Sequence, residues 1–217
     1  MPPPARLSDI RCPADCVPPR EAMLRAQPRS FGAARLPDGL RVTVRPACPW
    51  DAGRVQDYVR GLSLASRYDR FLAPVNELSP AELARVGGGG PRHGTLIAEI
   101  KIGGVRIMIG EARYAVGSSD GLTCEIALSV ADAWRGRGLG TLLMDYLECR
   151  ARSLGVTTLV GDVLRSNTAM RTLARKSGFG LGVPADAKLV RIVKDISAAR
   201  VGTPCAQRAT AGLPIAA

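Results

Sequence analysis

Six runs of the chain carry the hydrophobic pattern that is typical of β-strands. They span 41–45, 95–100, 105–116, 122–130, 157–164 and 188–196. Gly103 and Gly104 separate the second run from the third, which predicts a tight hairpin turn. The first run alternates polar and apolar residues, so it predicts a strand with one solvent-facing side.

Four other segments carry helix signals. Helices are expected over 51–64, from Ser79, over 139–153 and over 167–176. Asp51 is a suitable cap for the first of these, and Ser79 followed by Pro80 is a common helix start. Gly155 is expected to end the third helix, because glycine readily adopts the left-handed conformation found there.

The order of these elements predicts an α/β (α+β) fold, in which a mixed, mostly antiparallel central sheet is flanked by helices. The domain is expected over 41–196. Residues 1–40 are rich in proline and arginine without a clear period, which predicts a disordered leader, and 197–217 are expected to form a tail.

The composition bears on the cellular location of the protein and on the state of its cysteines. No apolar run approaches the roughly 20 residues that a membrane helix needs, and the N-terminus shows no hydrophobic segment of a secretory signal. We therefore expect a cytoplasmic protein without a membrane partner, in which the cysteines are free thiols. The spacing of the cysteines fits no zinc pattern, and His93 is the single histidine, so no metal is expected.

The net charge of +11 indicates an acidic partner. Aromatic residues make up only 4% of the chain, so platforms for base stacking are scarce and nucleic acid is not the expected partner. The phosphates of an acyl-CoA would also use a basic surface.

The most informative segment runs from Val130 to Thr141, where a predicted strand leads through a glycine-rich turn into a predicted helix. Glycines let the backbone approach a phosphate, and the unpaired N–H groups of a first helical turn bind anions. Arg135 and Arg137 add positive charge. The spacing of Gly136, Gly138 and Gly140 fits neither a dinucleotide fingerprint nor a Walker loop.

This segment resembles the pyrophosphate loop of the GNAT superfamily of acyl-CoA N-acyltransferases. A second GNAT-like signature follows, from Asn167 through a short helix to Gly178-Phe179, and the resemblance covers about 41–196. It implies acetyl-CoA as co-substrate and an amine as acceptor. The cofactor-binding residues it implies are Leu128, Val130, Arg135, Gly136, Arg137, Gly138, Leu139, Gly140, Thr141 and Asn167.

A narrower resemblance links the segments around 66–71, 77–83 and 124–130 to the acetyltransferase domain of bacterial Pat-type protein lysine acetyltransferases. It implies that Glu125 is the general base, with partial burial raising its pKa. The alternative from the residues alone is a salt bridge or a solvent-facing strand position. For Asn167, the alternative to cofactor binding is a helix N-cap.

The chain departs from many GNAT relatives at Ala174, where they place a tyrosine that protonates the leaving thiolate. Tyr114 and Tyr146 are conceivable replacements. A protein lysine is the leading acceptor, with a small amine as the alternative, and a non-catalytic acyl-CoA sensor stays open. Arginines between 62 and 92 are expected to disfavour polycationic acceptors. We expect a monomer or a homodimer.

Overall fold

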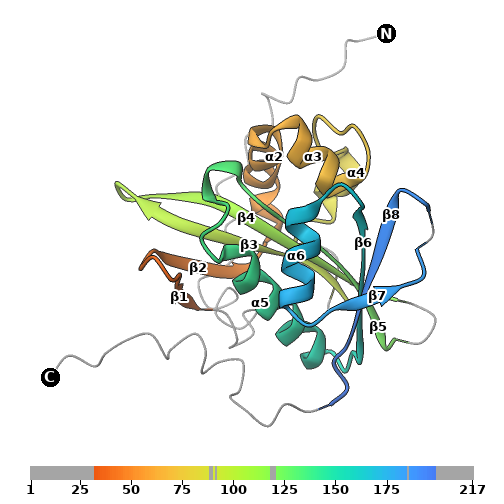
Figure 1. Ribbon diagram of the computed structural model, residues 1–217. Helices are drawn as coiled ribbons and strands as arrows, with labels where there is room; N and C mark the ends of the chain where they lie inside the picture. Colours follow the sequence, from red (N-terminus) through yellow and green to blue (C-terminus); the bar gives the residue numbers. More distant parts are fainter. Residues whose placement is uncertain (1–31, 88–89, 91, 118–120, 185, 199–217) are drawn as a thin grey trace, which may run out of the picture.

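The computed structural model describes residues 32–87, 90, 92–117, 121–184 and 186–198. They contain one eight-stranded sheet in the order β1-β2-β3-β4-β5-β6-β8-β7 (Figure 1). All neighbouring strands are antiparallel except β5 and β6. The strands are β1 (Ala33–Arg35), β2 (Arg41–Pro46), β3 (His93–Ile102), β4 (Val105–Val116), β5 (Thr123–Val130), β6 (Thr158–Leu164), β7 (Gly180–Gly182) and β8 (Leu189–Asp195).

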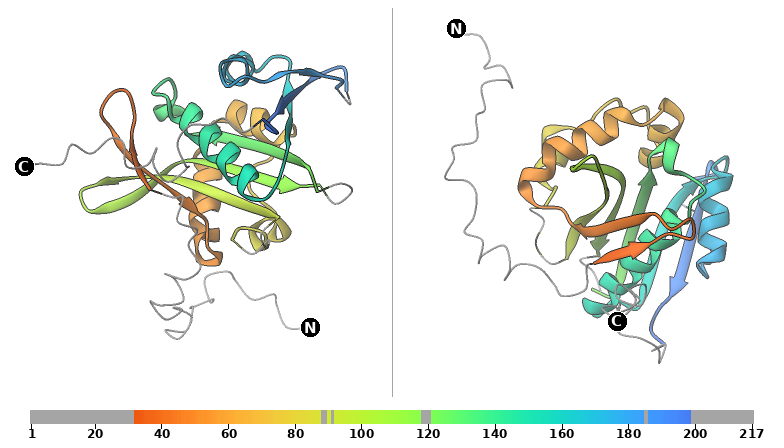
Figure 2. Two further views of the ribbon diagram at one scale, coloured as in Figure 1. Left: turned by 90° about the horizontal axis from the view of Figure 1, so that it is seen from below. Right: turned by 90° about the vertical axis from the view of Figure 1, so that its left-hand side faces the viewer.

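Helices cover both faces of this sheet (Figure 2). The longest, α5, packs on one face against alternate residues of β2 to β5, with Leu143 and Leu147 fully buried. On the opposite face, α2 and α4 enclose a second core around Val55, Val59 and Ile97. The helices are η3 (Pro49–Asp51), α2 (Ala52–Gly61), α3 (Leu64–Phe71), α4 (Pro80–Ala84), η4 (Asp132–Trp134), α5 (Leu139–Ser153) and α6 (Thr168–Lys176).

The predicted fold class and the six predicted strands are confirmed, with strand ends shifted by at most two residues. Five elements were not predicted: β1, η3, α3, η4 and β7. The expected helix over 51–64 ends at Gly61, because Leu62 is extended with ψ of 146°. Since β1 pairs with β2, the ordered domain begins before residue 41. The expectations for 1–31 and 199–217 lie outside the described residues.

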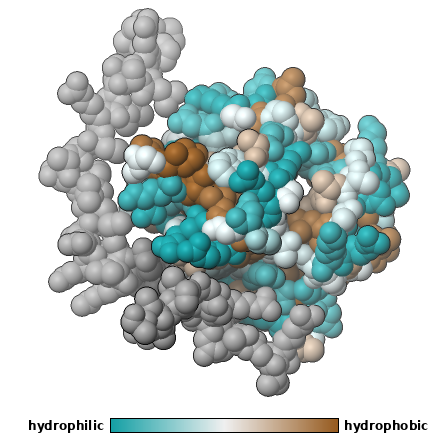
Figure 3. Space-filling model, turned by 60° about the vertical axis from the view of Figure 1, so that its left-hand side comes forward, coloured by the Kyte–Doolittle hydropathy of each residue, from teal (hydrophilic) through white to brown (hydrophobic). Residues whose placement is uncertain are grey.

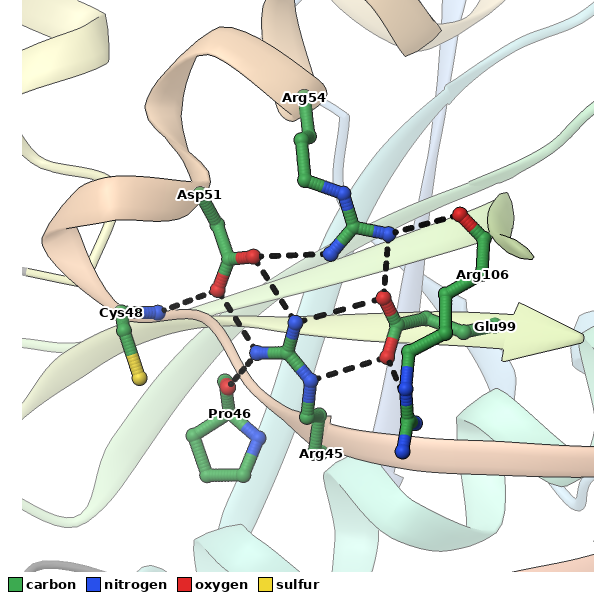
Figure 4. A network of polar contacts seen from close by, with 7 residues as sticks. All are labelled: Arg45, Pro46, Cys48, Asp51, Arg54, Glu99 and Arg106. Carbon is green, nitrogen blue, oxygen red and sulfur yellow. Dashed lines mark hydrogen bonds and ion pairs between the residues drawn. The ribbon is translucent and has the colours of Figure 1, made fainter. Parts of the chain in front are cut away.

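A polar network joins β2, β3 and the start of α2 (Figure 4). The carboxylates of Asp51 and Glu99 are each 1% exposed, and the Arg45 guanidinium lies between them at 2.7 Å and 3.0 Å. Arg54 contacts both carboxylates, and Arg106 reaches Glu99 at 3.6 Å. Buried carboxylates are tolerated only when they are paired. Because the paired groups come from the start of α2 and from the sheet, these contacts hold α2 on the sheet.

The face drawn in Figure 3 carries both hydrophilic and apolar areas. Exposed apolar side chains include Ile102, Val105 and Ile107 near the tip of the β3–β4 hairpin. No helix among the described residues is long and apolar enough to cross a membrane. Among the described residues, Cys48 and Cys124 are free thiols, as expected.

Strands β5 and β6 separate along their length, and this separation creates the site. Their parallel pairing covers only three residue pairs and ends at Glu125 and Val160. Gly161 follows, where an added Cβ would lie 3.1 Å from the carbonyl oxygen of Ile126. Beyond this point β5 continues to Val130 with only β4 as a strand partner among the described residues. One edge of β5 is therefore left open.

Candidate active site

A cavity of about 500 Å³ occupies the opening between β5 and β6. Its walls come from α3, β5, the loop that follows β5, the start of α5, β6 and α6. The backbone edge of β5 from Ile126 to Val130 lies along it. An extended ligand arm can pair with such an edge in the way that an added strand does.

Eight of the ten cofactor-binding residues implied by the sequence line this cavity: Leu128, Val130, Arg135, Gly136, Gly138, Gly140, Thr141 and Asn167. The side chains of Arg137 and Leu139 do not. Leu139 is 1% exposed and belongs to the core beneath the loop. The guanidinium of Arg137 lies 4.9 Å from the ring centroid of Trp134 and 3.5 Å from the Asp38 carboxylate.

The start of α5 is shaped for an anion. Gly136 and Gly138 have φ of 75° and 87°, values in the left-handed region that favours glycine. No side chain of the described residues caps α5, so the N–H groups of its first turn are left for a ligand. Gly140 has another role, because an added Cβ would lie 2.9 Å from the Leu173 side chain. It lets α5 and α6 approach closely.

Helix α3 is held over the cavity by a hydrogen-bonded cluster at its start. Asp132 accepts from the Ser63 backbone N–H at 3.0 Å and from the Ser66 hydroxyl at 2.5 Å. Arg135 donates to the Ser66 hydroxyl at 2.8 Å. Burial opposes ionisation of Asp132, but the hydrogen bonds from Ser63 and Ser66 lower its pKa. The pyrophosphate-type loop and α3 are thus one connected unit.

A second contact fixes the other end of α3. The Glu111 carboxylate is fully buried and accepts from Arg70 and Arg113, each at 2.9 Å. Burial opposes ionisation of Glu111, yet the charges of Arg70 and Arg113 lower its pKa. Beside it, the Tyr58 hydroxyl lies 3.1 Å from the Ser129 hydroxyl, and Ser129 lines the cavity. Burial raises the pKa of Tyr58.

Glu125 does not have the environment that was expected. Its side chain is exposed and is not among the residues that line the cavity, so the expectation of partial burial was wrong. It lies at the last paired position of β5, on the same strand face as Ala127 and Ser129. Both of those residues line the cavity.

Asn167 caps α6, because its side-chain oxygen accepts from the Met170 N–H at 2.9 Å. Ala174 is 2% exposed and packs with Val163, Val190 and Ile192. Neither proposed replacement for the missing tyrosine reaches the cavity. Tyr114 accepts a hydrogen bond from Arg150 at 3.0 Å, and Tyr146 donates to the Gly32 carbonyl at 3.4 Å.

The arginines of 62–92 do not form the expected repulsive wall. Arg67 donates to two backbone carbonyls, Arg70 pairs with Glu111, and Arg92 donates to the Gly117 carbonyl. Of Arg67, Arg70, Arg85 and Arg92, only Arg70 lines the cavity, and it is paired with Glu111. These arginines therefore give no reason for the cavity to disfavour polycationic acceptors.

Sequence reasoning assigned no role to several residues that line the cavity, among them Asp69, Lys176 and Ser129. Ser63 is the sequence signal that could have indicated α3, because serine is a common helix N-cap residue. In the structure its hydroxyl accepts a hydrogen bond from the backbone N–H of Ser66. A helix placed from that cap over 64–71 would have put Ser66 and Asp69 on one face.

A split mixed sheet with an open strand edge and an uncapped helix N-terminus offers a site of the kind that suits an extended phosphorylated ligand. The model of the acetyltransferase (GNAT) family matches residues 64–179, and the chain belongs to this family. It is an acyl-CoA N-acyltransferase with acetyl-CoA as co-substrate.

Individual relatives support the assignment of the chain to the GNAT family. An acetyltransferase of Pseudomonas aeruginosa is 33% identical over 145 residues, which are 66% of this chain and 77% of that protein. The acetyltransferase Pat of Mycolicibacterium smegmatis is 34% identical over 71 residues, 33% of this chain but only 21% of Pat. The solved GNAT domain of S. lividans PAT has a TM-score of 0.71 at 27% identity, covering 77% of this chain and 97% of that one.

More distant structures share the fold. The Salmonella typhimurium protein yncA, solved with acetyl-CoA, has a TM-score of 0.58 at 20% identity, covering 75% of this chain and 97% of that one.

Proposed function

We propose that this protein transfers the acetyl group of acetyl-CoA to the ε-amine of a lysine on a protein, with Glu125 as general base. The observation that carries the proposal is the cavity, which joins the uncapped start of α5 to the open edge of β5. Similarity to Pat and to the S. lividans PAT domain supports a protein lysine as acceptor.

In this proposal the pyrophosphate binds at the first turn of α5, where Gly136 to Thr141 offer N–H groups and Arg135 adds charge. The extended arm of the cofactor pairs with the backbone of Leu128 and Val130. Asn167 keeps its N-cap role and borders the bound arm. The thioester then lies near the point where β5 and β6 separate.

Glu125 lies at that same point. Side chains two positions apart on one strand face are separated by roughly 6.6 Å, so a glutamate at 125 can extend toward a group bound over Ala127. An acceptor ammonium first loses a proton to Glu125, which leaves a neutral amine. The amine nitrogen attacks the carbonyl carbon, the carbon–sulfur bond breaks, and the proton lost from the nitrogen goes through water to the thiolate.

Glu125→Gln tests the base. We expect kcat to fall by about 100-fold or more, while the affinity for acetyl-CoA is unchanged. Glu77→Gln is the matched control, because Glu77 is an exposed carboxylate that pairs with Arg60 away from the cavity. Equal turnover of wild type and Glu125→Gln across the full pH profile would rule out this role.

A small-molecule amine is the second candidate acceptor. The ion pair of Arg70 with Glu111 supports this candidate, because the charge of Arg70 then repels a cationic amine less strongly. A direct comparison of kcat/KM for a lysine peptide and for free polyamines separates the two acceptors. A higher value for every small amine than for the peptide would favour the second candidate.

A further inference from the structure

Asp69 is a carboxylate inside the cavity for which the reaction described above has no use. It lies on α3, one turn after Ser66, and its side chain is half-buried. Among the described residues, Asp69 and Asp162 are the acidic residues that line the cavity. Asp162 accepts from Arg191 at 2.8 Å, so its charge is already compensated.

Asp69 has no such compensation. It forms no hydrogen bond or salt bridge within the described part of the chain, although two arginines are near. Arg70 is turned to Glu111 at 2.9 Å, and Arg135 donates to Ser66 at 2.8 Å. Burial raises the pKa of the Asp69 carboxyl, against the opposing charge of Arg135. A half-buried carboxylate without a hydrogen-bonded partner among the described residues is stabilised by a cation that enters the cavity.

The position of Asp69 relative to β5 indicates which cation this is. Helix α3 packs on β5, and Asp69, Ala127 and Ser129 all line the cavity on this side. In the proposed function, the turn at the start of α5 and the open edge of β5 bind the acyl donor. The wall formed by α3 is left for the acceptor, whose reacting group arrives as an ammonium.

We propose that Asp69 is the acceptor-binding residue, which holds the ammonium of the incoming amine by a charge-assisted hydrogen bond before Glu125 removes its proton. This assignment rests on the proposed function. Asp69 takes part in no covalent step and selects cationic primary amines over neutral nucleophiles of the same size. The contacts of Ser66 and Arg70 at the two ends of α3 hold it in place.

The test uses the full chain, acetyl-CoA and a peptide with one lysine between neutral residues. For Asp69→Asn we expect the KM for the peptide to rise roughly tenfold or more, with kcat at saturation within about threefold of wild type. The KM for acetyl-CoA should not change, which also reports an intact fold. Asp69→Glu should recover part of the peptide affinity.

Asp57→Asn is the matched control, because Asp57 is an exposed aspartate on α2 whose side chain is 80% exposed. Calorimetry of the peptide on the CoA-saturated protein gives a readout without turnover, and Asp69→Asn should weaken binding by the same factor as the KM. An unchanged peptide KM and affinity would overturn the assignment, as would a fall in kcat with an unchanged KM. A wild type that neither binds nor acetylates any amine would instead remove the proposed function and this assignment together.

Discussion

Replacing Glu111 by glutamine should destabilise the protein more than any exposed charge change of the same kind. The Glu111 side chain is 0% exposed and forms ion pairs with Arg70 and Arg113, which are 8% and 22% exposed. The variant keeps the shape of the side chain but leaves two largely buried guanidinium groups without an anion. One nitrogen of Arg113, Nη2, is buried without a hydrogen-bond partner even in the wild type.

Removing one partner of a buried ion pair costs about 3–5 kcal/mol. Both arginines retain some solvent, so we expect a loss of about 3 kcal/mol in the free energy of unfolding. For a chain of this size the melting temperature changes by about 2–4 °C per kcal/mol, which gives a fall of about 6–12 °C. Urea unfolding followed by circular dichroism should show a lower midpoint with an unchanged slope.

The difference should depend on pH with a defined sign. Because the pKa of Glu111 is lowered in the folded state, its stabilising contribution is present above the unfolded value of about 4.3 and is lost as pH falls through the lower folded value. The stabilities of wild type and variant should therefore converge on acidification below about pH 4.

Glu77→Gln is the control, since the pair of Glu77 with Arg60 is more than half exposed on both sides. Exposed pairs contribute up to about 1 kcal/mol, so this variant should behave almost as wild type. Equal losses for Glu111→Gln and Glu77→Gln would show that burial of the ion pair makes no difference to its contribution.

Three further variants test the supports of the site. Asp51→Asn should lower the melting temperature by several degrees in a thermal scan, because Arg45 and Arg54 lose a 1% exposed anion; an unchanged value would contradict this. Asn167→Ala should cost about 0.5–2 kcal/mol by urea titration through loss of the α6 cap, whereas Asn167→Ser should cost less. Gly138→Val should abolish acetyl-CoA binding by calorimetry, because valine resists φ of 87°; normal affinity in a folded variant would refute the loop assignment.

The parts of the fold that could be predicted from sequence are those with strong periodicity and clear end signals. Helix α5 spans Leu139–Ser153 as expected, because its apolar stripe lies between a glycine-rich start and Gly155. The β3–β4 hairpin turns at Gly103 and Gly104, both with positive φ, also as expected. In these elements, local preference and tertiary packing agree.

Helix α3 could not be predicted in the same way. Its residue Leu64 is 71% exposed, and the helix is held mainly by polar contacts to Asp132 and Glu111, which are 66 and 41 positions from their partners Ser66 and Arg70. A short segment of sequence around α3 does not show which distant residues will contact it. Strand β7 is three residues long and largely exposed, so it also leaves no hydrophobic pattern.

The wrong expectation that Glu125 is partly buried has the same cause, because burial also depends on contacts with distant parts of the chain. An acidic residue within an apolar strand was expected to need a functional reason, yet Glu125 is exposed. The strand carboxylates that do need compensation are Glu99 and Glu111, at 1% and 0% exposure. Strand alternation gives the face of a residue but not what covers that face. The covering arginines come from β2, α2, α3 and β4.

Binding of the acetyl-CoA pyrophosphate at the turn between β5 and α5 underlies the whole proposed mechanism. Thermal unfolding with and without acetyl-CoA tests it most directly, with free CoA and ATP as controls. At 100 times the dissociation constant, binding stabilises the folded state by about 2.7 kcal/mol, which corresponds to a rise of about 5–11 °C. We predict this rise with acetyl-CoA and CoA but not with ATP; no rise at millimolar acetyl-CoA, or an equal rise with ATP, would rule out a specific CoA site at this turn.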